Sequence, residues 1–186
     1  MLLLATALLA ASPAPAWPAD TSLNGVTMSE TIEVDGRPLV LNGLALRKKA
    51  IFKVYVAGLY LSTHSSNPDE IVAVDAPRRM VMHFVRDVGK DKVCDAWNEG
   101  LEDNSPQNAA ALKPRFTRLC DLMDDIKDGE RFVFTYTPEK GTVVEVAGKE
   151  KGTIEGKDFA DAMLLCWIGP KPGPGEGFKK KLLGGS

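Results

Sequence analysis

The sequence predicts an α+β fold in which helices cover mainly one face of an antiparallel sheet. Three observations lead to this prediction: strand-like apolar segments come first, two helical stripes follow, and further strands and a last helix close the chain. Of the 186 residues, 44% are hydrophobic and 26% are charged, which is the composition of a soluble globular protein. A chain of this length is expected to form one domain.

The first half of the chain is predicted to be β-structure. Residues 26–34 and 38–47 alternate as strands, and the Asp-Gly dipeptide between them is typical of a tight hairpin turn. Residues 51–62 are apolar at nearly every position, which indicates a strand that is covered on both faces or central in its sheet. A further strand is expected over residues 79–86, with His83 as a structural side chain within it.

Helical periodicity begins after this strand. Residues 90–103 place apolar side chains on one stripe, and a second stripe runs from Leu112 to Ile126, with Pro114 at its start or at a kink. The acidic residues of the second helix fall on its solvent side, so they are interpreted as a solvated face rather than as a metal or acid–base site. They are Asp121, Asp124, Asp125 and Asp128.

The last third of the chain returns to strands and ends in a helix and a tail. Strands are expected over residues 131–137, 142–147 and 150–155. A third helix carries apolar side chains on one stripe from Phe159 to Trp167. The Gly/Pro-rich segment from Pro170 onward, which includes three lysines at 179–181, is interpreted as a solvated tail.

Charge and motif content exclude several classes of function. The 23 basic and 25 acidic residues give a net charge of −2, so no global field attracts the protein to nucleic acid or to an anionic membrane. Two histidines and three cysteines are too few and too scattered for a zinc cluster. The sequence contains no Gly-rich nucleotide loop, hydrolase elbow or calcium loop, and no cofactor is expected.

The N-terminus has the pattern of an export signal. Residues 1–11 are apolar but too short to span a bilayer, and alanines at 14 and 16 form a cleavage site of the Ala-x-Ala type. The alternative is that this run is an N-terminal strand or helix of the fold. We therefore expect a signal peptide over 1–16, a mature domain over 17–186 and a periplasmic location without stable membrane insertion.

The three cysteines lie in the segments that are expected to be helical. Export would place Cys94, Cys120 and Cys166 in an oxidising compartment, where disulfides form. Two interpretations remain open: all three are small buried hydrophobic side chains, or Cys94 and Cys120 form a bridge between consecutive helices.

Arg47 is a charged residue at the end of an apolar strand, which makes it a candidate binding residue. It ends an otherwise apolar strand, and regular alternation would place it on the same side as Leu39, Leu41 and Ala45. An inward guanidinium requires an acidic partner, because burying it unpaired is very unfavourable. That partner is either an internal Asp or Glu or the acidic head of a ligand. Tyr55 and Tyr60 in the next strand could add hydroxyl contacts.

Four blocks of sequence carry a family resemblance. They are Leu-Asn-Gly-Leu-Ala-Leu-Arg-Lys-Lys with Ile-Phe-Lys-Val-Tyr-Val-Ala-Gly-Leu-Tyr-Leu at 41–61, Ala-Trp-Asn-Glu-Gly at 96–100, Thr-Ile-Glu-Gly-Lys-Asp-Phe with Trp-Ile-Gly at 153–169, and Leu-Leu-Gly at 182–184. In this order they resemble chalcone isomerase-like proteins over residues 24–184. The resemblance implies an open-faced β-sandwich, in which a large antiparallel sheet and a layer of helices enclose a ligand cleft.

The same resemblance indicates which site residues are kept and which are lost. The catalytic members of the family use an Arg in the signature block, a Thr in the next strand, and a Tyr and an Asn around the following helix. Arg47 matches the Arg, but Tyr55 stands at the Thr position, and Gly89 and Ala96 fall near the other two positions. The resemblance therefore implies a site that keeps its anion-holding residue and lacks the groups that handle protons.

Two hypotheses of function follow. In the first, the protein binds a small amphipathic carboxylate such as a fatty acid, with Arg47 at the head group and Tyr55 and Arg86 nearby, and it is non-catalytic. The alternative is an isomerase or intramolecular lyase for an unsaturated or phenolic substrate. Arg47 would then stabilise an oxyanion, and Tyr55 or His83 would transfer protons. A structural role is the third possibility. No nucleic-acid partner is expected.

The export hypothesis makes a direct prediction. Protein produced in a bacterial host from the full gene should be recovered from the periplasm with its N-terminus at or near Trp17, as N-terminal sequencing will show. Cytosolic protein that retains Met1 would refute both the signal peptide and the oxidising compartment.

Overall fold

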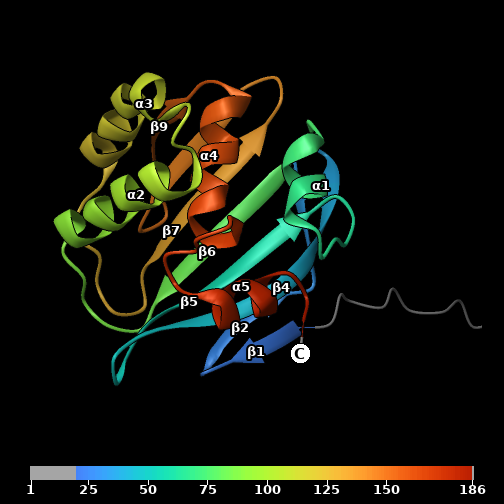
Figure 1. The fold of residues 1–186 in the computed structure, drawn as a ribbon. Coiled ribbons are helices and arrows are strands. Elements are labelled where there is room, and N and C mark those ends of the chain that lie inside the picture. Colours follow the sequence, from blue (N-terminus) through green and yellow to red (C-terminus); the bar gives the residue numbers. More distant parts are fainter. Residues whose placement is uncertain (1–19, 186) are drawn as a thin grey trace, which may run out of the picture.

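The computed structural model describes residues 20–185 (Figure 1). The signal peptide predicted over 1–16 and its cleavage site lie outside the described residues. Within the described part of the chain, a seven-stranded antiparallel sheet runs in the order β3-β4-β5-β6-β7-β8-β9, so that strands adjacent in sequence are neighbours in space. A separate hairpin pairs β1 with β2.

The strands are bounded as follows. They are β1 (Asp20–Leu23), β2 (Val26–Ser29), β3 (Thr31–Val34), β4 (Arg37–Lys49), β5 (Phe52–Leu61), β6 (Arg78–Phe84), β7 (Arg131–Thr137), β8 (Gly141–Val146) and β9 (Lys149–Ile154). The predicted strand over 26–34 is in fact two strands that belong to different sheets, with the break at Glu30. The β1–β2 pair was not predicted.

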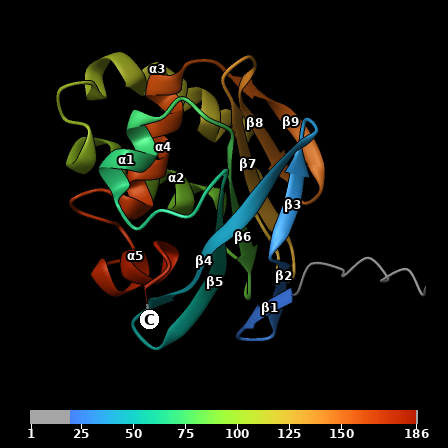
Figure 2. The same ribbon diagram turned by 90° about the vertical axis from the view of Figure 1, so that its right-hand side faces the viewer.

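The helices lie together on one side of the seven-stranded sheet, as Figure 2 shows, whereas the β1–β2 hairpin lies on the other side. They are α1 (Pro68–Ala73), α2 (Lys90–Asn104), α3 (Ala109–Leu122), α4 (Lys157–Ile168) and α5 (Glu176–Leu182). This arrangement confirms the predicted α+β class, with one antiparallel sheet and a helical layer. None of these five helices combines the length and the apolar composition that crossing a membrane requires.

The second and third of these helices follow the predicted stripes with two changes. Pro114 lies inside α3, not at its start. The helix ends at Leu122, and Ile126, which was predicted on the same helical stripe, instead forms a β-bridge with Val88. The acidic residues of this region are exposed, as predicted, and no group of three metal-ligating side chains is found within residues 20–185.

The main core fills the space between the sheet and the helices. Its largest fully buried side chains include Phe84, Phe116, Phe132, Phe159 and Trp167. The outer face of the sheet is covered over β5, where Val56 packs with Val26 and Met28 of β2. Strand β5 is therefore buried on both faces, as its continuous apolar sequence predicted.

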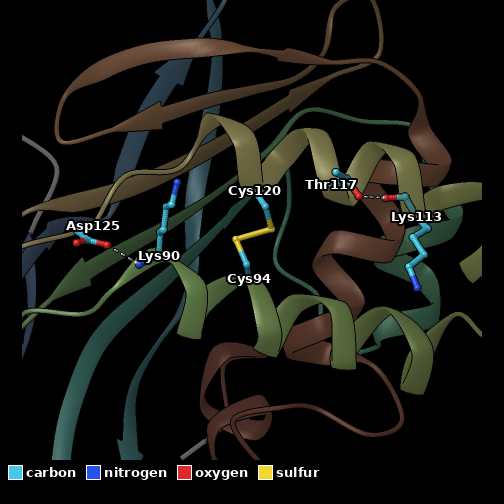
Figure 3. The surroundings of a disulfide bond; sticks show 6 residues. All are labelled: Lys90, Cys94, Lys113, Thr117, Cys120 and Asp125. Atoms are coloured by element: carbon cyan, nitrogen blue, oxygen red, sulfur yellow. Dashed lines mark hydrogen bonds between the residues drawn. A yellow bond between two sulfur atoms is a disulfide. The ribbon is translucent and has the colours of Figure 1, made fainter.

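Covalent and polar contacts tie the helical layer together. A disulfide joins Cys94 of α2 to Cys120 of α3, as Figure 3 shows, which decides between the two interpretations that the sequence left open. Cys166 of α4 is free and buried. It packs on Gly100 of α2, where an added Cβ would lie 2.8 Å from the Cys166 Sγ, so this helix crossing requires glycine.

The C-terminal segment is not a solvated tail, which corrects the prediction for the residues after Pro170. Helix α5 packs on β4, where a Cβ on Gly43 would lie 2.2 Å from the carbonyl oxygen of Lys181. The Asn42 side chain donates a hydrogen bond of 3.1 Å to the carbonyl of Leu182. Lys179 donates to the carbonyl of Gly169 at 2.9 Å, so that only the other two lysines of the run are exposed. Two buried side chains, Phe178 and Leu182, supply the apolar contact that the tail interpretation overlooked.

The disulfide should contribute substantially to stability. It spans 26 residues of sequence, and the chain-entropy model assigns a loop of this length about 3.5 kcal/mol. Replacing both cysteines (Cys94→Ala with Cys120→Ala) should lower the melting temperature by roughly 10 °C in a thermal melt. Reductant should destabilise the wild type and leave the double variant unchanged. Three freely alkylatable thiols in the native protein would contradict the bridge.

Candidate functional site

A cavity of about 840 Å³ lies between the sheet and the helices, next to the end where β4 and β5 meet. Its wall on the sheet side comes from β4, β5, β6 and the residues just after β6, and its opposite wall comes from α2 and α4. The loop between α4 and α5 closes one side. The apolar lining includes Val54, Met82, Phe84, Val93, Trp97 and Trp167. This volume lies in the usual range for small-molecule sites, roughly 300–1,000 Å³.

Two irregularities in the β4–β5 pairing decide which side chains reach this cavity. Between the pairs Leu41↔Tyr60 and Gly43↔Leu59, β4 contains one extra residue, so the inward and outward positions exchange. Leu39 and Leu41 therefore contribute to clusters on the outer face, while Ala45 and Arg47 face the helices. The sequence predicted that Arg47 shares a face with Leu39, Leu41 and Ala45. This prediction is wrong for the two leucines, because it assumed that side chains alternate without interruption along β4.

The second irregularity lies beside Arg47 itself. The pairs Arg47↔Tyr55 and Lys48↔Lys53 leave Val54 as an extra residue on β5. In regular alternation, Phe52 and Val54 would lie on the face opposite to Tyr55. The shift allows all three side chains to line the cavity. Side chains directly opposite on antiparallel strands share a face, so Arg47 and Tyr55 are neighbours in the cavity wall.

The Arg47 guanidinium is only partly satisfied by the protein. Its Nη1 donates a hydrogen bond of 2.8 Å to the carbonyl of Pro174 in the α4–α5 loop. Within the described part of the chain, Arg47 forms no ion pair. An internal Asp or Glu, the first of the two partners considered from the sequence, is therefore not found among these residues. The side chain is half-buried. A positive charge with unused donors thus faces a cavity that is partly lined by buried apolar side chains.

Tyr55 places a neutral hydroxyl beside this charge. Its phenol is 8% exposed and accepts a hydrogen bond of 3.1 Å from the indole nitrogen of Trp167. Burial raises the pKa of Tyr55 to about 12, although the Trp167 hydrogen bond and the charge of Arg47 both act to lower it. Because its oxygen already accepts a bond, the hydroxyl proton of Tyr55 is left to donate to a ligand. The rings of Phe84 and Phe178 pack around it, with centroids at 5.5 and 6.0 Å.

Arg86 is the third predicted site residue, and it also lines the cavity. Its side chain is exposed at the mouth, where the guanidinium carbon stacks 4.6 Å from the centroid of the Phe52 ring. The structure thus brings Arg47, Tyr55 and Arg86 to one cavity, with the first two deeper than the third.

Other residues considered from the sequence lie elsewhere. Tyr60 faces the outer side of the sheet, and its hydroxyl donates to the carbonyl of Ser29 at 2.9 Å. His83 lies on the same outer side, where its Nδ1 accepts from Arg131 at 3.0 Å, and burial together with the Arg131 charge lowers its pKa. Gly89 precedes α2 without lining the cavity, whereas Ala96 does line it. Neither Tyr60 nor His83 can assist chemistry there.

Sequence reasoning missed the segment that closes the site. The loop 169–175 reads Gly-Pro-Lys-Pro-Gly-Pro-Gly, and most of it lines the cavity. Asn104 of α2 fixes it through two hydrogen bonds with the backbone of Lys171, at 2.8 and 3.0 Å. The alternating prolines were a usable signal, because their locked φ angles predict a defined path rather than a flexible tail.

The groups in the cavity suit anion binding better than proton transfer. Burial raises the pKa of the Cys166 thiol to about 12, so it is a poor nucleophile, and Tyr55 is equally reluctant to ionise. Four acidic residues line the cavity and all are exposed: Asp87, Asp103 and Glu176 pair with Lys127, Lys171 and Lys179, whereas Glu99 forms no ion pair within residues 20–185. The Arg47 guanidinium and the Tyr55 hydroxyl remain as donors next to the buried apolar wall of the cavity.

Comparison with known proteins identifies the family. The model of the family described as chalcone isomerase-like matches residues 20–184. The chain belongs to the chalcone isomerase-like family. This membership confirms the resemblance seen in the sequence blocks between residues 24 and 184. No curated protein matches the chain.

A solved structure shows the same fold. The crystal structure of a fatty-acid binding protein from Arabidopsis thaliana is similar with a TM-score of 0.69 and 15% sequence identity. The alignment covers 89% of this chain and 96% of that chain. At this identity the similarity establishes the fold, and it confirms the chalcone isomerase-like architecture that the sequence predicted.

The tyrosines provide a test of the site's electrostatics. All three (Tyr55, Tyr60 and Tyr136) have raised pKa values, so native protein should show little tyrosinate absorbance near pH 10, where unfolded chains are half ionised. Because folding favours the neutral phenol of Tyr55, this stability is fully present below pH 10 and is lost as pH rises through about 12. Tyr55→Phe should remove a step near pH 12 from the spectroscopic titration. A native midpoint near 10 for that step would disprove the burial argument.

Proposed function

We propose that this chalcone isomerase-like protein binds a small amphipathic carboxylate such as a fatty acid, and that it carries its ligand in the periplasm without converting it. The observation that supports this most is the unpaired Arg47 guanidinium beside the neutral Tyr55 hydroxyl, next to the apolar wall of an 840 Å³ cavity. A carboxylate between them would accept charge-assisted bonds from Arg47 and one from Tyr55.

The shape and lining of the cavity support an apolar tail on this ligand. Next to Tyr55, the apolar part of the wall includes the buried side chains of Met82, Phe84 and Trp97, whereas the charged lining residues other than Arg47 are exposed. An alkyl chain placed there would exchange water for aliphatic and aromatic contacts, which stabilises binding by about 25 cal/mol for each Å² of apolar surface buried. The structural neighbour from Arabidopsis thaliana is a fatty-acid binding protein, which is consistent with this ligand class.

The residues around Arg47 argue for binding without catalysis. The resemblance to the family's enzymes implies that Tyr55 stands at the position of the catalytic Thr and Ala96 near that of the Asn. With the pKa values of Tyr55 and Cys166 both raised to about 12, the deep part of the cavity offers no group that exchanges protons readily at neutral pH. An isomerase would need such a group close to Arg47.

Two features support a periplasmic location. The N-terminal residues 1–16 have the pattern of a cleavable signal, and the Cys94–Cys120 disulfide is a bond that persists in oxidising compartments.

Arg47 should govern ligand affinity more than stability. Hydrogen bonds to charged groups contribute about 1.5–3 kcal/mol, so Arg47→Ala should weaken binding of a long-chain fatty acid by roughly 10- to 100-fold. Arg47→Lys should restore only part of this loss, because an ammonium lacks the planar fork. Calorimetric titration of the wild type and both variants with a fatty acid measures these effects.

The matching fatty alcohol is the control for the carboxylate. It should bind more weakly than the acid and respond little to either substitution at Arg47. Thermal melts of the same variants test the structural alternative, with exposed Arg118→Ala as a matched loss of an arginine. A large drop in melting temperature for Arg47→Ala without any acid-specific loss of affinity would disprove the binding role.

A further inference from the structure

We propose that the tip of the β4–β5 hairpin, residues 48–53, docks this protein on the surface of an anionic lipid bilayer. The inference deepens the proposed function and rests on it for its purpose, because the docked tip would bring the cavity mouth to a source of amphipathic carboxylates. Figure 1 shows this hairpin, coloured teal, extending beyond the rest of the sheet.

The first observation is apolar exposure at an end of the sheet. Ile51 is 86% exposed and its neighbour Phe52 is 54% exposed. Among residues 20–185, only Val74 is another large hydrophobic side chain with comparable exposure. The turn itself is Ala50-Ile51, with Ala50 at a φ of 53°, a conformation that Gly or Asn adopts more easily. A tight turn without glycine or a polar residue at its tip is unusual for a loop that meets only water.

The second observation is a local excess of positive charge. Residues 36–68 contain no Asp or Glu, while Arg47, Lys48, Lys49 and Lys53 cluster around the turn. Lys48 and Lys53 are direct cross-strand partners, and like charges in that position destabilise a hairpin. None of these lysines forms an ion pair within the described part of the chain. An anionic surface would relieve the repulsion, since each basic residue near such a surface favours binding roughly fivefold.

The third observation is that the tip and the cavity mouth are continuous. Lys49 and Phe52 face the cavity and line it, and Arg86 stacks on Phe52 at 4.6 Å. The alternating residues Lys48 and Lys53 therefore point to the other face of the hairpin. Apolar side chains at a basic tip have the composition of segments that insert into the interface of a bilayer. The net charge of −2 provides no global attraction, so the interaction depends on this local patch.

The test is co-sedimentation of mature protein with vesicles. Wild type should bind vesicles of phosphatidylcholine mixed with phosphatidylglycerol and should bind pure phosphatidylcholine weakly, with added salt reducing the binding. Ile51→Ser should weaken binding to the mixed vesicles about tenfold or more. Lys48→Gln with Lys53→Gln should weaken it roughly 25-fold. None of the three positions lines the cavity, so the affinity for dissolved fatty acid should stay unchanged.

Matched control variants distinguish binding through this surface from non-specific binding to vesicles. Val74→Ser removes a side chain of similar exposure, and Lys113→Gln with Arg118→Gln removes two exposed charges from α3. Both controls should bind vesicles like the wild type. Equal binding by tip and control variants, or sedimentation of the protein without vesicles through self-association at Ile51, would overturn the proposal. If the fatty-acid titration fails but the vesicle experiment succeeds, the proposed ligand is refuted and the membrane-docking surface is not.

Discussion

The pairing of β4 with β5 is the constraint on which the site depends. Side chains alternate along a strand, so a single extra residue moves every later side chain to the opposite face. The extra residue on β4 turns Arg47 inward, and the extra residue Val54 on β5 adds Val54 and Phe52 to the same wall as Tyr55. Without the first shift, Arg47 would point to the outer face. The cavity would then be an apolar space with no charge.

The C-terminal segment contributes to the same cavity as strands β4 and β5, and it fixes the position of Arg47. Helix α5 can approach β4 because Gly43 presents no side chain, and Asn42 holds it through the carbonyl of Leu182. The loop before α5 then supplies Pro174, whose carbonyl orients the Arg47 guanidinium. Because one Arg47 nitrogen is already bonded, the side chain is held in place without a ligand, which would reduce the conformational entropy lost on binding the proposed carboxylate.

The sequence predicted the class of fold and singled out three residues that line one cavity, but not the details that join them. Periodicity found the central strands and helices, and the family blocks pointed to Arg47, because both depend on local patterns. The irregularities in β4 and β5 leave no such pattern, so Leu39 and Leu41 were assigned to the wrong face. Residues after Pro170 were interpreted as solvated because composition reports polarity, whereas burial of Phe178 depends on a strand more than a hundred residues earlier.

The same hairpin connects the two properties proposed for this protein. Arg47 lies inside the cavity and Lys48 lies on the opposite face, although they are adjacent in sequence and carry the same charge. The hairpin itself carries no carboxylate from residue 36 to residue 68, so its own charges are all positive from the exposed tip to Arg47. A carboxylate leaving a lipid surface would meet Lys49 and Arg86 before it reaches Arg47 and Tyr55. Lys49 and Arg86 are exposed, Arg47 is half-buried and Tyr55 is buried, so a carboxylate on this path would be attracted more strongly at its end than at its start.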